Sequence, residues 1–229
     1  MTTVLVAGAT GAVGSALIPA LRQRGFTAIP HVRPKTAAKH PLGSDADALI
    51  CDLADSVKLD EAMRRSQAVV CSVGTMRRRF AQGDTYESSD YLPVVQLVES
   101  AKRTGGNQYF VLVSALGAKP GNGYLGWKYK AEEVVRQSGL PHAILRPSFL
   151  DSTHSASKPS DGKDRAPPPL AGALLKGLGA LPGLRGISED LRPIPVDDLC
   201  AAIVALLRET RNLDEIQTGR HLWSLARDR

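Results

Sequence analysis

The sequence predicts an α/β fold, in which helices cover both faces of a doubly wound parallel β-sheet. Short β-rich apolar runs alternate along the chain with longer helical stretches, and such alternation is typical of parallel strands joined by crossover helices. The first apolar run is followed at once by a glycine-rich turn and a helix. At 229 residues the chain is long enough for one large domain of this kind and short for two.

Six strands are expected, each from a short run rich in apolar residues. The run nearest the middle of the chain, Tyr109–Val113, is the richest in the β-branched and aromatic residues that favour strands. In order, the strands are expected at Thr3–Ala7, Thr27–Val32, Ala48–Cys51, Ala68–Ser72, Tyr109–Val113 and His142–Leu145.

Five helices are expected between and after these strands. Gly25, Gly105-Gly106 and Ser138-Gly139 end three of them, because glycine adopts the backbone conformation that terminates a helix. Asp197 or its neighbour is placed to cap the last helix. The expected helices are Ser15–Arg24, Ser56–Arg65, Tyr91–Arg103, Leu125–Gln137 and Asp197–Arg208.

The stretch Asp151–Pro169 interrupts this alternation. It is rich in Ser, Lys, Asp and Pro and ends in three consecutive prolines, which predicts a flexible loop over residues 151–169. Such a loop is either a lid over a site or a surface insertion. Residues 170–229 would then form small C-terminal elements on the substrate side of a single domain, residues 1–229.

The basic balance of the chain raises the question of a nucleic-acid partner, and the distribution of charge argues against one. The net charge is +6, but the basic residues are spread along the chain, aromatic residues make up only 5%, and no RNA- or DNA-binding motif appears. Arg77-Arg78-Arg79 is the one tight cluster. It is either a solvated loop or a contact for an anionic cofactor or substrate.

A cytoplasmic protein without a membrane span is expected. The longest apolar stretch, Leu170–Leu184, is interrupted by Lys176, by glycines and by Pro182, so it is unsuited to a bilayer. No basic segment precedes the first apolar run, as a signal peptide would require. The three cysteines, Cys51, Cys71 and Cys200, have no metal-ligand spacing. We expect them to be small core residues.

A glycine-rich turn, residues 8–14, follows the first strand and leads into the first helix. Gly8 permits the tight turn, Gly11 lets the backbone approach a diphosphate without a Cβ in the way, and Gly14 lets the helix pack closely on the sheet. Backbone N–H groups at the positive end of the helix would bind the diphosphate. These features predict a Rossmann-type dinucleotide site formed by Gly8, Ala9, Thr10, Gly11, Ala12, Val13 and Gly14.

The residues after the second strand indicate which dinucleotide is bound. An acidic residue there would prefer the ribose of NAD(H), but the segment 31–35 contains none. Arg33 can stack on adenine and bind a 2′-phosphate, and Lys35 adds positive charge. We therefore expect NADP(H) rather than NAD(H), the alternative being that both side chains are solvated surface cations.

Two later strand ends are expected to border the same cofactor. Asp52 and Leu53 follow the third strand and would meet the adenine. The loop after the fourth strand would approach the adenosine ribose or the diphosphate, unless Gly74 serves only a tight turn. Its residues are Ser72, Val73, Gly74 and Thr75.

A reactive constellation follows the fifth strand. Ser114 lies at the end of that strand, and Tyr124 and Lys128 have the i, i+4 spacing of neighbours on one helix face. Tyrosine has a pKa near 10 in isolation, and a nearby ammonium favours the phenolate. Tyr124 would act as general acid, Lys128 would hold the cofactor ribose and tune the tyrosine, and Ser114 would orient a substrate oxygen. Alternatively, the tyrosine and lysine are a surface helix pair.

Taken together, these segments resemble the atypical short-chain dehydrogenase/reductases, in the branch of NAD(P)H-binding oxidoreductases that includes the Tat-interacting protein. The similarity extends over GATGAVG, VCSVGT at 70–75, VSALGA at 113–118, YLGWK at 124–128, LRPSFL at 145–150 and IPVDDL at 194–199. The resemblance implies Ser114, Tyr124 and Lys128 as the catalytic triad. It also implies that Pro147 and Ser148 border the nicotinamide and that Arg77 contacts a phosphate.

The chain departs from that family at one place. Members often have two consecutive hydroxyl residues where this sequence has Ser114-Ala115, and the interval to Tyr124 is shorter than usual by a residue or two.

The leading expectation is an NADPH-dependent oxidoreductase that reduces a small-molecule carbonyl substrate, as a monomer or homodimer. A non-catalytic NADP(H)-binding redox sensor is the alternative, and a sugar-nucleotide epimerase is a third, for which the chain is short.

Overall fold

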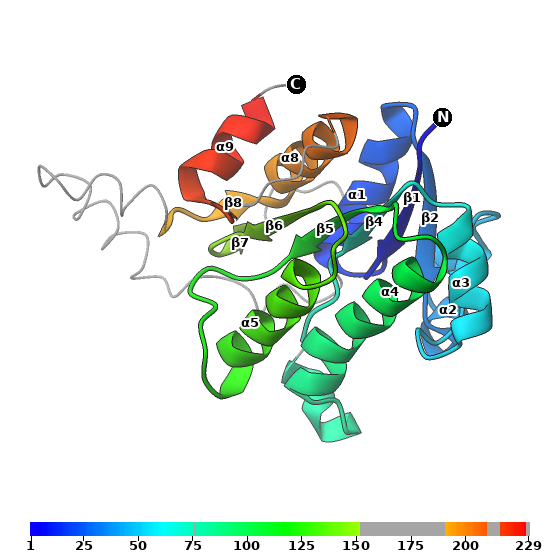
Figure 1. Cartoon of the computed structure of the whole chain (residues 1–229), viewed down its shortest axis with the longest axis horizontal. Coiled ribbons are helices and arrows are strands. Elements are labelled where there is room, and N and C mark those ends of the chain that lie inside the picture. The colour runs from blue at the N-terminus through cyan, green and yellow to red at the C-terminus, as the bar shows by residue number, and fades with distance from the viewer. Residues whose placement is uncertain (76, 152–190, 210–215, 228–229) are drawn as a thin grey trace, which may run out of the picture.

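A seven-stranded parallel β-sheet forms the centre of the molecule (Figure 1). The computed structural model describes residues 1–75, 77–151, 191–209 and 216–227. The strand order is β3-β2-β1-β4-β5-β6-β9, and every neighbouring pair is parallel. The strands are β1 (Thr3–Ala7), β2 (Thr27–Val32), β3 (Leu49–Ile50), β4 (Ala68–Cys71), β5 (Tyr109–Val113), β6 (His142–Arg146) and β9 (Gln217–Thr218).

This order confirms the predicted fold class. The six strands β3-β2-β1-β4-β5-β6 have the arrangement of the Rossmann fold, and β9 adds one strand at the edge next to β6. The order reverses between β1 and β4, and in such sheets a crevice for ligands lies at the carboxyl ends of the two strands where the order reverses. A separate two-stranded pair, β7 (Leu150–Asp151) and β8 (Ile194–Pro195), lies beyond β6 in the chain.

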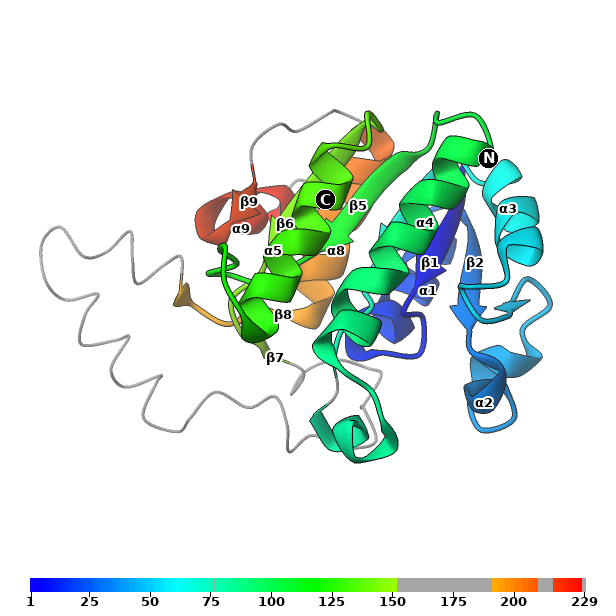
Figure 2. The ribbon, with the colours of Figure 1, turned by 60° about the horizontal axis from the view of Figure 1, so that its bottom comes forward.

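Helices cover both faces of the sheet (Figure 2). One face packs against α1 (Ala12–Gln23), α8 (Val196–Glu209) and α9 (Gly219–Arg227), and the other against α3 (Ser56–Arg64), α4 (Leu92–Arg103) and α5 (Gly123–Arg136). Because successive side chains of a strand point to opposite faces, β1 contributes Val4 and Val6 to the first core cluster and Leu5 and Ala7 to the second. Short helices α2 (Pro34–Ala37), η1 (Pro41–Ser44), η2 (Arg77–Gln82) and the π-helical turn η3 (Glu87–Tyr91) lie in the connections.

The bounds of three predicted strands, β1, β2 and β5, agree with the structure, and helix α3 begins at Ser56 as predicted, whereas the other four predicted helices begin at different residues. Helix α1 begins at Ala12 rather than Ser15, because the small residues after Gly11 already have helical backbone. Helix α5 begins at Gly123 rather than Leu125, which places Tyr124 in its first turn. Of the loop predicted over 151–169, Asp151 belongs instead to strand β7, and the rest lies outside the described residues.

The three cysteines are free thiols and are buried, as predicted. Burial raises the pKa of the Cys71 thiol to about 11, so this thiol remains protonated near neutral pH. Among the helices of the described ranges, none is long and apolar enough to cross a membrane.

The buried imidazole of His31 in β2 makes the stability of the fold depend on pH. Burial lowers the pKa of His31 in the folded state, outweighing its hydrogen bond with the Cys51 carbonyl at 3.0 Å. The unfolded chain, with a histidine pKa of about 6.5, then binds a proton more readily than the folded chain. Stability is therefore expected to fall as the pH drops below about 6.5. Urea unfolding between pH 7.5 and 5.5 measures this loss.

A matched pair of variants isolates the contribution of His31. His31→Gln removes the ionisable group and is expected to flatten the pH dependence of the unfolding free energy. His221→Gln, which removes an exposed imidazole, is expected to leave the dependence in place. Equal slopes for the wild type and His31→Gln would contradict the assignment.

Candidate functional site

The glycine loop after β1 touches the loop after β4 at the predicted crevice. Gly8 has a φ of +85°, a conformation that favours glycine. A Cβ at Gly8 would lie only 2.8 Å from the carbonyl carbon of Ser72 and from the amide nitrogen of Val73. A Cβ at Gly14 would lie 2.3 Å from the carbonyl oxygen of Gly8. The close approach of these backbones therefore requires glycine at both positions.

The start of α1 presents backbone N–H groups beside this loop. Gly11 is the N-cap, and no side chain caps the helix. The Gly11 amide donates to the carbonyl of Gly8 at 2.9 Å, and the first amide bonded to Gly11 is that of Ser15, also at 2.9 Å. The amides of Ala12, Val13 and Gly14 accordingly have no acceptor within the helix. A turn with glycine at positions 8, 11 and 14, lined with amides at the positive helix end, fits the diphosphate of a dinucleotide.

The remaining residues of the loop are small and well placed for this role. Ala9 is buried, and Thr10 is half-buried at the turn itself. Ser72 fixes the neighbouring loop to β1, since its amide and its hydroxyl both donate to the carbonyl of Ala7, at 2.9 and 3.1 Å. The loops after β1 and β4 are therefore joined at the point where the sheet order reverses.

The ends of β2 and β3 carry the residues predicted to bind the adenosine part. Arg33 and Lys35 are exposed, and Arg33 is the N-cap of the short helix α2. Asp52 is exposed, and its carboxylate accepts a hydrogen bond from the Ala54 amide at 3.0 Å. Leu53 is buried in the core. The two cations are therefore free to face solvent or an anionic ligand, while Leu53 serves packing.

Tyr124 and Lys128 occupy successive turns of α5, and their exposure differs sharply. The Lys128 side chain is 5% exposed, whereas Tyr124 is 36% exposed. The Lys128 ammonium lies 5.9 Å from the centre of the Tyr124 ring. The Tyr124 ring also contacts that of Tyr86 at a centroid distance of 5.8 Å. A half-exposed phenol thus lies beside a buried positive charge.

The Lys128 ammonium also reaches the loop that touches Gly8. It donates to the carbonyl of Val73 at 3.3 Å and to the carbonyl of Val113 at 3.4 Å. Burial lowers the pKa of Lys128, but the coulombic attraction of Tyr124 and the charge and hydrogen bond of Asp90 outweigh burial, so the pKa is raised. The structure therefore brings Lys128 to the loop after β4.

Ser114 lies at the end of β5, where the sequence places it, but its hydroxyl is directed to another partner. It donates to the carboxylate of Glu132 in α5 at 2.5 Å, and Ser114 is only 5% exposed. The proton of the serine hydroxyl is therefore engaged inside the protein. A hydrogen bond from Ser114 to a substrate oxygen would require this proton to turn away from Glu132.

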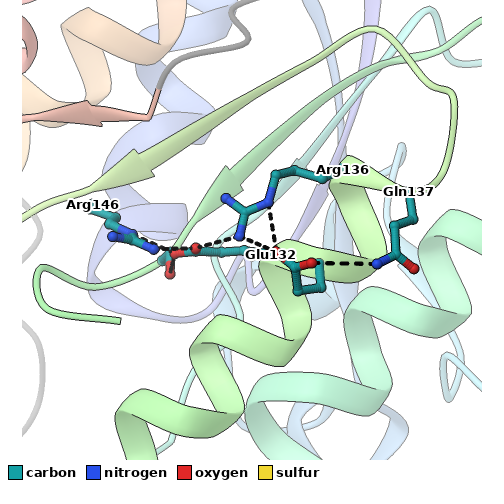
Figure 3. Close-up of polar contacts among 6 residues, drawn as sticks. Glu132, Arg136, Gln137 and Arg146 are labelled. Carbon is teal, nitrogen blue, oxygen red and sulfur yellow. Dashed lines mark hydrogen bonds and ion pairs between the residues drawn. The ribbon is translucent and has the colours of Figure 1, made fainter. Parts of the chain in front are cut away.

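Glu132 is the centre of a buried charged network that ties α5 to β6 (Figure 3). Its side chain is 0% exposed. Arg146, the last residue of β6, donates to both carboxylate oxygens at 2.8 and 2.6 Å. Arg136, one turn further along α5, lies 3.6 Å away and also pairs with Glu133. The network fixes the helix that carries Tyr124 against the strand end that leads to Pro147.

The segment after Arg146 forms the far side of the site. Pro147 is buried, and its carbonyl accepts a hydrogen bond from the Leu116 amide at 2.9 Å. The Ser148 hydroxyl donates to the carbonyl of Arg192 at 2.6 Å, which joins this segment to the chain before β8. Arg77 begins η2, and its side chain lies outside the described part of the structure.

Three charged residues of the site, Asp90, Glu132 and Arg146, have no role predicted from the sequence, although Arg146 lies within the LRPSFL segment. Asp90 pairs with Lys128 at 3.0 Å. Glu132 continues the spacing of Tyr124 and Lys128 by four residues, so it lies on the same face of α5. That spacing is the signal that could have identified it. Asp90 lies before a helix, where an acidic residue ordinarily indicates a cap.

Comparison with known proteins identifies the family to which the chain belongs. Residues 8–167 match a family described as NAD(P)H-binding. Protein TIC 62, chloroplastic, of Arabidopsis thaliana is 29% identical over 182 residues, 68% of this chain and 28% of that protein, so the chain spans less than a third of its length. Sanguinarine reductase of Eschscholzia californica is 26% identical over 193 residues, 66% of this chain and 70% of that enzyme.

A solved structure extends the likeness in fold. A short-chain dehydrogenase/reductase superfamily protein from Agrobacterium tumefaciens, with bound NAD, has a TM-score of 0.61 and 19% identity over 89% of this chain and 73% of that one. The family match covers more than half of the 229 residues. The chain therefore belongs to the NAD(P)H-binding family, in agreement with its resemblance to the atypical short-chain dehydrogenase/reductases.

Proposed function

We propose that this protein is an NADPH-dependent oxidoreductase that reduces a small carbonyl compound, with Tyr124 as the proton donor. The observation that carries the proposal is the half-exposed Tyr124 phenol beside the buried Lys128 ammonium, at a distance of 5.9 Å from the ring centre. Lys128 in turn bonds the loop that touches Gly8. The proposed proton donor, the Lys128 ammonium and the turn proposed to hold the diphosphate thus lie at the carboxyl ends of the strands of the sheet. The sanguinarine reductase relative supports reductase chemistry.

The proposal assigns a separate role to each residue. NADPH, when bound, supplies the hydride that reduces the carbonyl carbon. Tyr124 donates a hydrogen bond to the carbonyl oxygen and gives up its proton as negative charge develops there. The Lys128 ammonium stabilises the phenolate that remains, because an opposite charge nearby favours the ionised form. Ser114 holds the end of β5 through Glu132, so Tyr124 is left as the hydroxyl that faces the substrate.

The proposed preference for NADPH over NADH rests on Arg33 and Lys35. Both are exposed at the end of β2, where dinucleotides of this fold place the adenosine ribose. Arginine binds phosphate through two parallel hydrogen bonds, and charged hydrogen bonds contribute about 1.5–3 kcal/mol. Arg33→Ser is therefore expected to weaken NADPH binding by about 10- to 100-fold and to leave NADH binding nearly unchanged.

Fluorescence titration with each nucleotide measures this preference. Lys39→Ser removes an exposed cation a few residues further on, and it is expected to leave both affinities unchanged. An equal loss of NADPH and NADH affinity in Arg33→Ser would show that the arginine does not read the 2′-phosphate. Wild-type preference for NADH would remove this part of the proposal.

One observation favours a second function, a non-catalytic NADP(H)-responsive binding protein. The hydroxyl proton of Ser114, one of the three expected catalytic groups, is engaged by Glu132. Steady consumption of NADPH with any member of a panel of aldehydes, ketones and quinones distinguishes the two functions. Tight NADPH binding without consumption across the whole panel would favour the binding protein.

A further inference from the structure

Asp90 is a buried carboxylate that pairs with Lys128, the lysine beside the proposed proton donor. Its side chain is 0% exposed and lies 3.0 Å from the Lys128 ammonium. The same carboxylate accepts a hydrogen bond from the Thr75 amide at 3.3 Å and another from the Thr75 hydroxyl. A carboxylate at this depth is rarely found without a charged partner. Asp90 therefore connects Lys128 to the loop after β4.

The backbone that carries Asp90 is unusual. Residues Glu87–Tyr91 form a π-helical turn, η3, that leads directly into α4. Turns of this kind are rare and occur frequently at functional sites. The η3 turn lies against α5, so that Asp90 meets Lys128 across the interface of the two elements.

The hydrogen bonds of Lys128 are all made inside the protein. An ammonium group has three N–H donors. In Lys128 the acceptors are a carboxylate oxygen of Asp90 at 3.0 Å, the Val73 carbonyl at 3.3 Å and the Val113 carbonyl at 3.4 Å. A hydrogen bond from Lys128 to a cofactor ribose would have to replace one of these. In this arrangement the lysine acts on Tyr124 through its charge.

That charge depends on the groups around it. The titratable groups that act on the Lys128 ammonium are Tyr124 from the preceding turn of α5, Asp90 from η3 and the thiol of Cys71 from β4. Cys71 is a protonated thiol whose pKa is about 11, and Tyr124 is the group whose ionised form the lysine is proposed to stabilise. Asp90 is thus the carboxylate that pairs with Lys128 in the interior and offsets its burial.

We propose that Asp90 is a positioning residue, which keeps Lys128 charged and holds it between the ends of β4 and β5 beside Tyr124. Asp90 acts through Lys128 and does not itself contact the reacting atoms. The inference rests on the proposed roles of Tyr124 and Lys128, but the charge of Lys128 can be measured without turnover.

The test is a pH titration of Lys128 in protein labelled with ¹³C at the lysine Cε, whose NMR shift reports the charge. The signal that disappears in Lys128→Met identifies the residue. In the wild type we expect Lys128 to keep its proton at a pH at which a lysine buried without a carboxylate partner has lost it, because Asp90 offsets burial. In Asp90→Asn we expect the lysine to lose its proton at a pH lower by about one unit or more.

A matched control and a contrary outcome make the test decisive. Asp60→Asn removes a carboxylate that pairs with Arg103 near the surface, and it is expected to leave the Lys128 titration unchanged. A Lys128 that loses its proton at the same pH in Asp90→Asn as in the wild type would overturn the proposal.

Turnover supplies an independent arm. If the enzyme reduces a carbonyl compound, the alkaline limb of its rate profile is expected to move to lower pH in Asp90→Asn, in parallel with the NMR titration. An unmoved limb would overturn the positioning role. Absence of turnover in the wild type would refute the proposed function, and the NMR result would still decide whether Asp90 keeps Lys128 charged.

A second variant covers the case in which Asp90→Asn is too unstable to titrate. The double variant Asp90→Asn/Lys128→Met leaves no unpaired charge in the interior, and an unpaired buried charge is what destabilises such a protein. The double variant is therefore expected to unfold at a higher urea concentration than the single variant. If it unfolds at the same or a lower concentration, the ion pair is not the reason that Asp90 is needed.

Discussion

Tyr124→Phe is expected to lower the turnover of carbonyl reduction by about 10²- to 10⁴-fold, the usual contribution of general acid catalysis. The change removes one oxygen from Tyr124, a residue that is 36% exposed. It does not alter the turn that contains Gly8, Gly11 and Gly14. Binding of NADPH should therefore remain as in the wild type. Steady-state rates, combined with a fluorescence titration of NADPH, separate the two effects.

Tyr129→Phe is the matched control for this prediction. Tyr129 lies on the same helix, with its ring near Arg136 rather than Lys128, and the loss of its hydroxyl is expected to leave turnover unchanged. Full activity in Tyr124→Phe would mean that another group or a water molecule supplies the proton. A loss of NADPH binding in Tyr124→Phe would instead assign the phenol to the cofactor.

Glu132→Gln is expected to destabilise the protein by about 3 kcal/mol, because breaking a buried ion pair by removing one partner leaves uncompensated charge in the interior. Arg146 and Arg136 both lose their shared carboxylate, and Ser114 loses its acceptor. Against the 5–15 kcal/mol of stability that is usual for a folded domain, the loss is about a fifth or more. Urea unfolding monitored by circular dichroism measures it.

The neighbouring residue offers a close control. Glu133 also pairs with Arg136, but its side chain is 33% exposed, and ion pairs of that kind contribute about 0–1 kcal/mol. Glu133→Gln is therefore expected to change stability by no more than about 1 kcal/mol. Similar losses in the two variants would show that burial of Glu132 is not what makes its ion pairs important.

Much of the fold could be predicted because apolar runs that alternate with helical stretches are the pattern that a parallel sheet with crossover helices requires. Strands β1, β2 and β5 are apolar runs bounded by turn residues, and their predicted ends match the structure. The short strand β9, which joins the sheet beside β6, has only two residues. Nothing in Gln217 and Thr218 alone indicates a strand. They form one because they pair with the edge of β6 that would otherwise be open.

The site was predictable where it depends on short sequence spacing and not where it depends on contacts across the fold. The glycine loop and the pair Tyr124 and Lys128 each lie within one segment. Asp90 meets Lys128 across 38 positions of the chain, and the π-helical backbone that places it has no recognised sequence signal. Arg146 is the last residue of β6, a position at which a charged side chain ordinarily points to solvent. Its ion pair with Glu132 becomes evident only when the fold shows that this carboxylate is buried beside it.

The contact of Gly8 with Ser72 and Val73 has a practical consequence for redesign. The turn proposed to hold the diphosphate lies where the loops after β1 and β4 meet, and the cations proposed to choose between the two nicotinamide dinucleotides lie on the connection after β2. If the proposed preference for NADPH holds, exchange of Arg33 and Lys35 is expected to change the choice of cofactor, whereas any side chain added at Gly8 would meet backbone within 3 Å. Libraries aimed at switching the dinucleotide should vary Arg33 and Lys35 and leave Gly8 unchanged.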